Sequence, residues 1–394
     1  MTAAIFSALK GDNVTIIEHN DRLGKKLLAT GNGRCNLTNR LLEKDIDSHF
    51  CDLGCADRAF YEHVITAFGY NDTIRFFKEL GLMFKYRQDL VYPNSDQASS
   101  VLDALRFKIR ELGIDTIFEC NVTGVCKEND TFVIRSDKGI YKCDKLILAT
   151  GSKAMPSSGS DGSGYRIAES FGHTIDNVRP GLVQIKSDEE YFKSVSGVRC
   201  AAALSLYDDN EKKYEERGEL QFTDYGISGI AAMNLSNRLH VCKGTPYVHV
   251  DFLNDIKKEE LTDILTDRKR LLGRREAQDF MTGIVNKKLG IMLLKSVGIK
   301  PSGQVSDIAD KELLMLAENL KDFVIRVDGT KGFEQAQICM GGVSTAQIDE
   351  NMQSRIVPSL YFCGEIINLH GDCGGYNLQL AWSTGAIAGG ASKR

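Results

Sequence analysis

The sequence predicts an α/β fold that is interrupted by an inserted region of different patterning. Two short apolar runs, residues 13–18 and 145–149, have the composition of buried parallel strands, and a helical segment precedes the first of them. From residue 184 the pattern changes to strands and then to charged helices. We therefore expect residues 1–183 and 333–394 to form one α/β domain and residues 184–332 to form an insert, first β-rich and then helical.

The composition is that of a globular enzyme and argues against several other classes of protein. The chain has 394 residues, of which 42% are hydrophobic and 26% charged, with a formal net charge of −4. A dedicated nucleic-acid binder would carry a basic excess, so we expect no nucleic-acid partner. Neither a run of 18 apolar residues nor a signal-peptide pattern occurs, so we expect a cytoplasmic protein without a membrane span.

The cysteines predict free thiols and no metal site. Their number is 11, and an odd count without an export signal is typical of a reducing compartment. Cys51 and Cys55 lie four residues apart, but no second pair and no clustered histidine completes a zinc site.

Helix and strand alternate at the start of the chain. Residues 2–10 are rich in helix-forming residues, and Gly11 follows as a C-cap. Residues 13–18 form a strand that ends in Glu18, and residues 24–38 form a glycine-rich, basic loop. Leucine and isoleucine recur at helical spacing between residues 97 and 112, which predicts an amphipathic helix there.

The rest of the chain is predicted as follows. Short β runs separated by turn residues occupy 114–119, 121–126, 131–136 and 139–143, and the apolar strand 145–151 ends in the tripeptide ATG. A flexible Ser/Gly loop over 152–164 precedes a helix at 165–172. The insert is strand-like from 184 to about 254 and helical from 255 to 320, and the strands 323–329 and 336–343 follow.

Glu18 is a weak signal for a dinucleotide site. In dinucleotide-binding βαβ units, an acidic residue at the end of the second strand hydrogen-bonds the adenosine ribose. A glutamate at a strand end is, however, more often simply solvated. The glycine fingerprint G-x-G-x-x-G, expected about 20 residues earlier, has no counterpart in the chain, which begins inside the expected helix. We expect either a start upstream of Met1 or the loss of the first strand.

The segment GNGRCN (31–36) predicts a ligand-binding loop. Its two glycines let the backbone approach a ligand closely, and Arg34 can pair with a phosphate or a flavin carbonyl. Lys25 and Lys26 add positive charge just before it. An ordinary surface loop is the alternative, but the density of Gly, Arg, Asn and Thr favours a ligand.

The strongest local signal lies near the C-terminus, in CGE (363–365) and GDCGGYNLQLAWSTG (371–385). A Gly-Gly turn that enters a helix presents free N–H groups to an anion or a carbonyl oxygen. A tight turn before a packed helix would explain the glycines but not the polar residues that follow them. The basic run at 268–275 carries interleaved acidic residues, so we interpret it as a solvated helix face.

Together these segments resemble one family closely. They are NVTIIE (13–18), GKKLLATGNGRCNLTN (24–39), LILATG (146–151), GELQFTDYGISG (218–229), CMGGVS (339–344) and FCGEIINLHGDCGGYNLQLAWSTGAIAG (362–389). The chain resembles the BaiN/RdsA family of NAD(P)/FAD-dependent oxidoreductases, which includes aminoacetone-oxidase-type FAD-binding enzymes. This resemblance implies a Rossmann-like FAD-binding domain of the glutathione-reductase type with an inserted β-barrel-like and helical domain.

The resemblance also implies FAD as cofactor, NAD(P)H as electron donor and a set of binding residues. Glu18 would hold the ribose, the loop 31–36 would cover the pyrophosphate and flavin, and Val122 would contact adenine through its backbone. The full set is Glu18, Lys25, Lys26, Gly31, Asn32, Gly33, Arg34, Cys35, Asn36, Val122, Ala149, Thr150, Gly151, Gly364, Glu365, Asp372, Gly374, Gly375, Tyr376, Asn377, Leu378 and Gln379. Arg34, His370 and Tyr376 are the candidate catalytic residues because each can donate near the flavin.

The expected activity is hydride transfer between NAD(P)H, flavin and a small organic substrate, with the reduction of a bile-acid-type enone implied by the resemblance. Two alternatives stay open: a truncated flavoprotein homologue that no longer binds FAD, and a tRNA-modifying flavoprotein, against which the acidic balance argues. Because the first strand of the sheet is not in the chain, we expect an interruption between strands 13–18 and 145–149. We also expect weaker FAD binding and lower stability than in a form extended by about 15 residues.

Overall fold

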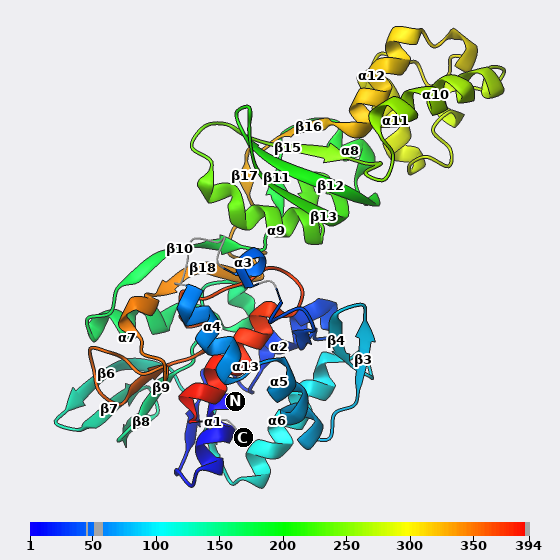
Figure 1. Cartoon of the computed structure of the whole chain (residues 1–394). Coiled ribbons are helices and arrows are strands. Elements are labelled where there is room, and N and C mark those ends of the chain that lie inside the picture. Colours follow the sequence, from blue (N-terminus) through cyan, green and yellow to red (C-terminus); the bar gives the residue numbers. More distant parts are fainter. Residues whose placement is uncertain (45, 51–57, 391–394) are drawn as a thin grey trace. The chain divides into compact units, whose positions relative to one another are not determined.

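The computed structural model describes residues 1–44, 46–50 and 58–390, and these form two compact units (Figure 1). The first unit contains residues 1–181 and 333–394, and the second contains residues 182–332. Cys51 and Cys55, weighed above as metal ligands, lie outside the described residues. No helix in the described ranges is long and apolar enough to cross a membrane.

The first unit combines helices with several small sheets. Its helices are α1 (Thr2–Leu9), α2 (Lys25–Ala29), α3 (Ile46–His49), α4 (Arg58–Ala67), α5 (Tyr70–Glu79), α6 (Ala98–Glu111), α7 (Ser163–Ser170) and α13 (Tyr376–Ala388). Its strands are β1 (Thr15–Ile17), β2 (Thr38–Asn39), β3 (Phe84–Arg87), β4 (Leu90–Pro93), β5 (Asp115–Ile117), β6 (Val122–Glu128), β7 (Thr131–Ser136), β8 (Gly139–Cys143), β9 (Leu146–Leu148), β10 (Ile175–Gly181), β18 (Ile338–Val343) and β19 (Leu360–Phe362).

The parallel strands form two separate ladders. Strand β1 pairs with β5, and β9 pairs with β19, both in parallel. Within the described residues, no strand joins the two ladders. Residues 13–18 and 145–149, which we expect as parallel strands of one sheet, lie in these two separate ladders. The expected interruption between these strands agrees with the two ladders.

The helix predicted at 97–112 is present as α6, whereas no prediction from the sequence covers α3, α4 and α5. Helix α6 buries Val101, Leu102, Leu105 and Ile109 on one face, against a core that also holds Phe77 and Trp382. The stretch 24–38, predicted as a loop, begins with the short helix α2. Lysine, leucine and alanine favour helix, and Leu27 packs into the same core, so burial adds to local propensity here.

The three-stranded antiparallel sheet of β6, β7 and β8 follows the predicted meander. Strand β7 lies in the middle, and its Phe132 is fully buried. The hairpin from β7 to β8 turns at Asp137 and Lys138, where Ser136 lies opposite Gly139. Gly139 has a φ of 134°, which a side-chain-bearing residue adopts only under strain.

The second unit is a sheet with helices. Its strands are β11 (Ile185–Lys186), β12 (Arg199–Asp208), β13 (Glu211–Thr223), β14 (Gly226–Ser228), β15 (Pro246–Asp251), β16 (Phe323–Arg326) and β17 (Gly329–Thr330). Its helices are α8 (Phe192–Val195), α9 (Ile230–Arg238), α10 (Lys258–Leu272), α11 (Lys287–Ser296) and α12 (Asp310–Lys321), and the last three gather at one end of the sheet (Figure 1).

The two ends of this strand order are one nearly continuous stretch of chain, which is compatible with the expected barrel-like insert. The strand order is β16-β15-β12-β13-β14-β11-β17, and only Val327 and Asp328 separate β16 from β17. Their backbone N–H groups donate to Pro246 of β15 at 3.1 Å and to Lys186 of β11 at 3.0 Å. Closure of a barrel needs continuous pairing around the circumference. Here the strands on one side, β11 and β17, are two residues long, whereas β12 and β13 span 10 and 13 residues.

A buried histidine in the first unit is held in its neutral form. His173 is 4% exposed, and its Nε2 lies 2.8 Å from Oγ of Ser354. That Oγ accepts hydrogen bonds from the backbone N–H groups of Ile356 (3.0 Å) and Val357 (2.8 Å). Both lone pairs of the hydroxyl are thereby used, so Ser354 donates its own proton to Nε2. Burial lowers the pKa of His173, against a hydrogen bond with Gln347 that raises it.

We expect this contact to make folding sensitive to mild acid. Because the pKa of His173 is lower in the folded than in the unfolded chain, the unfolded chain binds more protons once the pH falls below about 6.5. The free energy of unfolding should therefore decline as the pH is lowered from 7 to 5. In His173→Gln, which accepts the same hydrogen bond but does not titrate, urea unfolding should show a smaller decline. Equal declines in both proteins would contradict this assignment.

Candidate functional site

Glu18 is held in place at the end of β1. Its backbone N–H continues the ladder to the carbonyl of Ile117 at 2.9 Å. Its Oε1 accepts hydrogen bonds from the backbone N–H of Asn20 (3.0 Å) and from Asn20 Nδ2 (2.9 Å). Lys25 Nζ donates to Asn20 Oδ1 at 3.0 Å. These hydrogen bonds fix the orientation of the Glu18 carboxylate, and Asn20 links it to Lys25. A carboxylate fixed in this way can accept hydrogen bonds from a ribose.

An ion pair joins three of the predicted ligand segments. Lys26, from the segment before the GNGRCN loop, pairs with Oε2 of Glu365 in the CGE segment. Ser152, directly after ATG, donates its hydroxyl to the same Oε2 at 3.2 Å and accepts from the backbone N–H of Ala154 at 3.2 Å. Segments that lie more than 300 residues apart in sequence thus meet at one carboxylate. The side chains of Lys26 and Glu365 are 23% and 26% exposed, so the pair adds only modestly to stability.

The site glycines fall into two groups. Gly33 and Gly364 have φ values of 81° and 75°, and a Cβ added at Gly364 would meet no atom within 4 Å. At Gly33 the nearest atom would be the carbonyl oxygen of Leu28 at 4.0 Å. Gly375, with φ 94°, lies against the backbone of Thr38, whose carbonyl carbon would be 2.8 Å from such a Cβ. The first two leave space for a ligand, whereas Gly375 is required for packing.

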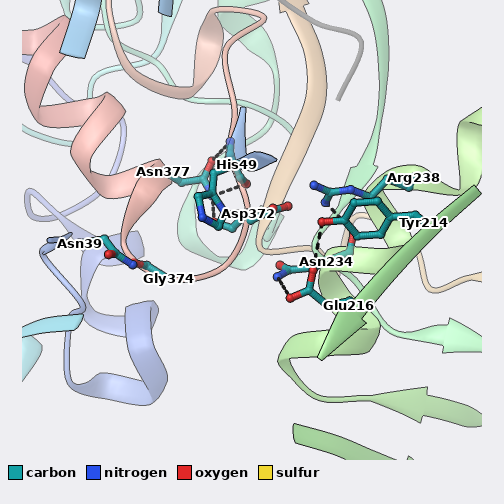
Figure 2. Close-up of polar contacts among 10 residues, drawn as sticks. Asn39, His49, Tyr214, Glu216, Asn234, Arg238, Asp372, Gly374 and Asn377 are labelled. Atoms are coloured by element: carbon teal, nitrogen blue, oxygen red, sulfur yellow. Dashed lines mark hydrogen bonds and ion pairs between the residues drawn. The ribbon is translucent and has the colours of Figure 1, made fainter. Parts of the chain in front are cut away.

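The turn before α13 is fixed by side chains (Figure 2). Asn377 accepts from the backbone N–H of Gly371 at 2.9 Å and donates to the carbonyl of the same residue at 2.8 Å. Asn39 Nδ2 donates to the carbonyl oxygen of Gly374 at 3.0 Å. The N-terminus of α13 itself, at Gly375, has no side-chain cap. A rigid turn thus leads into a helix end that can offer backbone N–H groups.

Sequence reasoning missed His49, which the structure brings to this turn. Its Nδ1 lies 3.5 Å from Oδ2 of the buried Asp372 (Figure 2). Its ring stacks on Tyr376 at a centroid distance of 4.3 Å. The backbone N–H of Asp372 donates to the carbonyl of His49 at 3.2 Å. No motif surrounds His49, and more than 300 residues separate it from its partners, so the sequence alone offers no signal for it.

Three predicted cofactor residues have side chains that make contacts inside the protein. Gln379 is fully buried, and its amide accepts from Thr38 Oγ1 at 2.6 Å and donates to the carbonyl of Phe68 at 3.1 Å and to Ser383 Oγ at 2.9 Å. Cys35 is fully buried, and desolvation raises the pKa of its thiol to about 12. Leu378 packs against the core around α6. These side chains are engaged inside the protein, so we assign them to packing.

The loop 31–36 offers donors and an acceptor. Arg34 Nε donates to the carbonyl of Gly31 at 3.2 Å, and Asn32 adopts a φ of 54°. Gly31 would place a Cβ 3.1 Å from the backbone nitrogen of Asn36, so it packs within the loop. Asn36 Oδ1 is buried and has no hydrogen-bond partner among the described residues. A bound ligand with an N–H or O–H group would satisfy that acceptor.

The other residues predicted to bind the cofactor or to act in catalysis also belong to the first unit. Ala149 and Thr150 are exposed directly after β9, Gly151 follows with φ 75°, and Val122 begins β6. Of the catalytic candidates, Tyr376 is 2% exposed. His370 is 3% exposed, and its backbone carbonyl accepts from the Tyr61 hydroxyl at 2.7 Å.

The donor and acceptor set of this unit fits FAD. A fixed carboxylate ends β1, two open left-handed glycines and an uncapped helix end offer backbone contacts, and Asn36 carries an orphaned buried oxygen. A ribose needs an acceptor, and a pyrophosphate needs N–H donors and cations. A flavin ring needs both donors and acceptors at its edge.

Comparisons with known proteins bear on this site. The family model of the HI0933-like protein Rossmann domain matches residues 1–391. A 3-dehydro-bile acid delta(4,6)-reductase of Clostridium scindens is 38% identical over 400 residues, which cover 100% of this chain and 96% of that protein. A ribosomal RNA dihydrouridine synthase of Escherichia coli is 26% identical over 392 residues, covering 98% of this chain and 93% of that protein.

Among solved structures, a quinol-fumarate reductase with menaquinol molecules aligns with a TM-score of 0.50 at 13% identity. The alignment covers 98% of this chain and 68% of that one. At this level of identity, the likeness concerns the fold alone.

We expect Gly375 to be far less replaceable than a glycine of similar φ elsewhere. Gly375→Ala incurs the strain of a positive φ and a contact with the backbone of Thr38, and should lower the free energy of unfolding by about 3 kcal/mol. Gly11, with φ 95° and no atom within 4 Å of an added Cβ, is the matched control. Gly11→Ala should cost about 1 kcal/mol. Urea unfolding of both variants measures the difference, and equal losses would refute the packing role of Gly375.

Proposed function

The chain belongs to the HI0933-like family of Rossmann-domain proteins, and from this premise we propose that it is an FAD-dependent oxidoreductase that reduces a conjugated carbon–carbon double bond in a steroid-like ketone. The observation that carries the proposal is the 38% identity, over the whole chain, with a protein named as a bile acid delta(4,6)-reductase. The meeting of three ligand segments at Glu365 supports it independently.

We propose the following residues as the FAD site. Glu18 would accept hydrogen bonds from the ribose, and Arg34 and Asn36 would face the pyrophosphate or flavin from their loop. Gly364 and Glu365 would lie along the ribityl chain, with Glu365 held by Lys26 and Ser152. When bound, FAD supplies a hydride donor and acceptor. NAD(P)H is the proposed source of electrons.

Reduction of a conjugated double bond adds a hydride to one carbon and a proton to its neighbour. We propose His49 as the source of that proton. Its side chain is 28% exposed and can take up a proton from water, whereas Asp372 beside Nδ1 is 1% exposed. The carboxylate of Asp372, 3.5 Å from Nδ1, lies where it can orient the ring. Tyr376 stacks on the ring and limits its rotation.

The similarity to a ribosomal RNA dihydrouridine synthase supports a second candidate, the reduction of uridine in RNA. The 5,6 double bond of uridine is also conjugated to a carbonyl, so the same hydride and proton additions would apply. The net charge of −4 argues against a nucleic-acid substrate. The third possibility is a homologue that has lost FAD binding. The flavin measurement described below distinguishes it from the two enzymatic candidates.

The purified chain supplied with FAD should reduce a 3-oxo-Δ4 steroid anaerobically when NADPH or NADH is added. Mass spectrometry of the product should show the gain of two hydrogen atoms per double bond. Flavin retained after gel filtration is measured on the same sample. A protein that retains no flavin would contradict the proposal, as would one that retains flavin and reduces uridine-containing RNA but no steroid.

The role of His49 is tested with a matched histidine. His49→Gln should slow flavin reoxidation by the steroid by about a hundredfold and leave flavin content unchanged. His63→Gln is the control, because His63 is on α4 and its Nε2 contacts a backbone carbonyl, that of Glu350 at 2.8 Å. Stopped-flow mixing of the reduced protein with steroid gives the rates. If His49→Gln reacts as fast as His63→Gln, another group supplies the proton.

A further inference from the structure

Three cations converge on one carboxylate beside the GNGRCN loop. In the hairpin of β3 and β4, Lys85 lies opposite Tyr92 and Arg87 lies opposite Leu90. Residues paired in this way project from the same face of a sheet, so Lys85, Arg87 and Tyr92 share one face. Lys85 Nζ and Arg87 Nη2 both donate to Oδ2 of Asp96, at 2.6 and 2.9 Å.

Arg34 completes this group, which we call the Tyr92 cluster: Arg34, Lys85, Arg87, Tyr92 and Asp96. The guanidinium carbon of Arg34 lies 5.8 Å from the centroid of the Tyr92 ring, and that of Arg87 lies 5.2 Å from it. The hydrogen bond from Lys85, followed by the charges of Arg87, Lys85 and Arg34, lowers the pKa of Asp96. Three positive groups therefore surround one negative group and leave an excess of two charges.

The cluster has more cationic donors than its own carboxylate can use. An ammonium has three N–H donors and a guanidinium has five, whereas Lys85 and Arg87 each donate one hydrogen bond to Asp96. Their side chains are 32% and 42% exposed, so these groups are accessible from solvent. Tyr92 is 7% exposed, and the guanidinium groups of Arg34 and Arg87 both lie over its ring. A rigid, accessible pair of guanidinium groups with a lysine suits phosphate, which accepts several such hydrogen bonds at once.

We propose that Arg34, Lys85 and Arg87 bind the phosphate groups of NAD(P)H. This inference rests on the proposed function, in which a nicotinamide nucleotide delivers electrons to FAD. Arg34 belongs both to the cluster and to the loop proposed to face the flavin, so a dinucleotide anchored here would arrive beside its electron acceptor. Neither Lys85 nor Arg87 belongs to a motif that the sequence singles out, and both reach the loop only through the β3–β4 hairpin.

Binding of NADPH and of NADH is measured by nucleotide fluorescence at low salt, with and without FAD. Lys85→Gln and Arg87→Gln should each raise the Kd by about tenfold, and the double variant should raise it further. Arg110→Gln is the matched control, because Arg110 also lies over an aromatic ring, that of Phe107 at 5.1 Å, on α6. Circular dichroism melts show that each variant is folded. Inorganic pyrophosphate should compete with the nucleotide for the wild-type protein.

These binding titrations test the proposal without requiring the protein to reduce a substrate. A larger loss for NADPH than for NADH would support contact with the 2′-phosphate, and equal losses would support contact with the pyrophosphate. Kd values within twofold of wild type in all cluster variants would overturn the proposal. So would the absence of nucleotide binding by the wild-type chain, or a loss confined to a uridine-containing RNA oligonucleotide. Failure of the proposed enzymatic function is detected by different measurements, the flavin content of the purified protein and the reduction of the steroid.

Discussion

Buried hydrogen bonds from one helix, α13, hold the first unit together around its candidate site. Trp382 Nε1 donates to the carbonyl of Leu37 at 3.0 Å, and Gln379 binds both Thr38 and Phe68. Thr384 Oγ1 accepts from the backbone N–H of Gly364 at 3.0 Å. A buried polar group left without its partner costs more than the bond itself contributes, so these contacts specify where each segment lies. The loop at 31–39 and the CGE turn are therefore positioned from the far end of the chain.

This arrangement explains which contacts could be predicted from the sequence and which could not. The helix at 97–112 and the strand at 13–18 were predictable because their apolar spacing is local and strong. Gln379 is predicted to bind the cofactor because it belongs to the polar residues that follow the Gly-Gly turn and because the family resemblance implies it. Its partners on β2 and after α4 become visible only in three dimensions. His49 and the pair Lys85 and Arg87 were missed for the same reason, since their partners are set by packing and not by spacing.

Charge is balanced differently in the two polar centres of this unit. Lys26 and Glu365 form a one-to-one pair, which leaves that centre neutral and lets it orient a ligand without attracting ions. The Tyr92 cluster carries three cations against one carboxylate and retains its attraction for anions. Both centres draw a residue from the stretch 24–38, so a neutral and a cationic environment lie along one short piece of chain. A flavin enzyme needs both kinds of environment, one to orient a ring and one to recruit a charged donor.

The antiparallel ladder of β10 and β18 has a consequence for how the chain is made. Gly181, at the end of β10, lies opposite Ile338, at the start of β18. The segment 182–332 therefore begins and ends close to the same end of this two-stranded ladder. During synthesis, the first 181 residues leave the ribosome well before β18, β19 and α13, which complete their core. The intervening unit is contiguous in sequence and has its own core, so it can fold while the earlier residues still wait for partners. Until α13 is made, the apolar residues of α1 and α6 lack Trp382 and Ala386, with which they share a core in the complete chain.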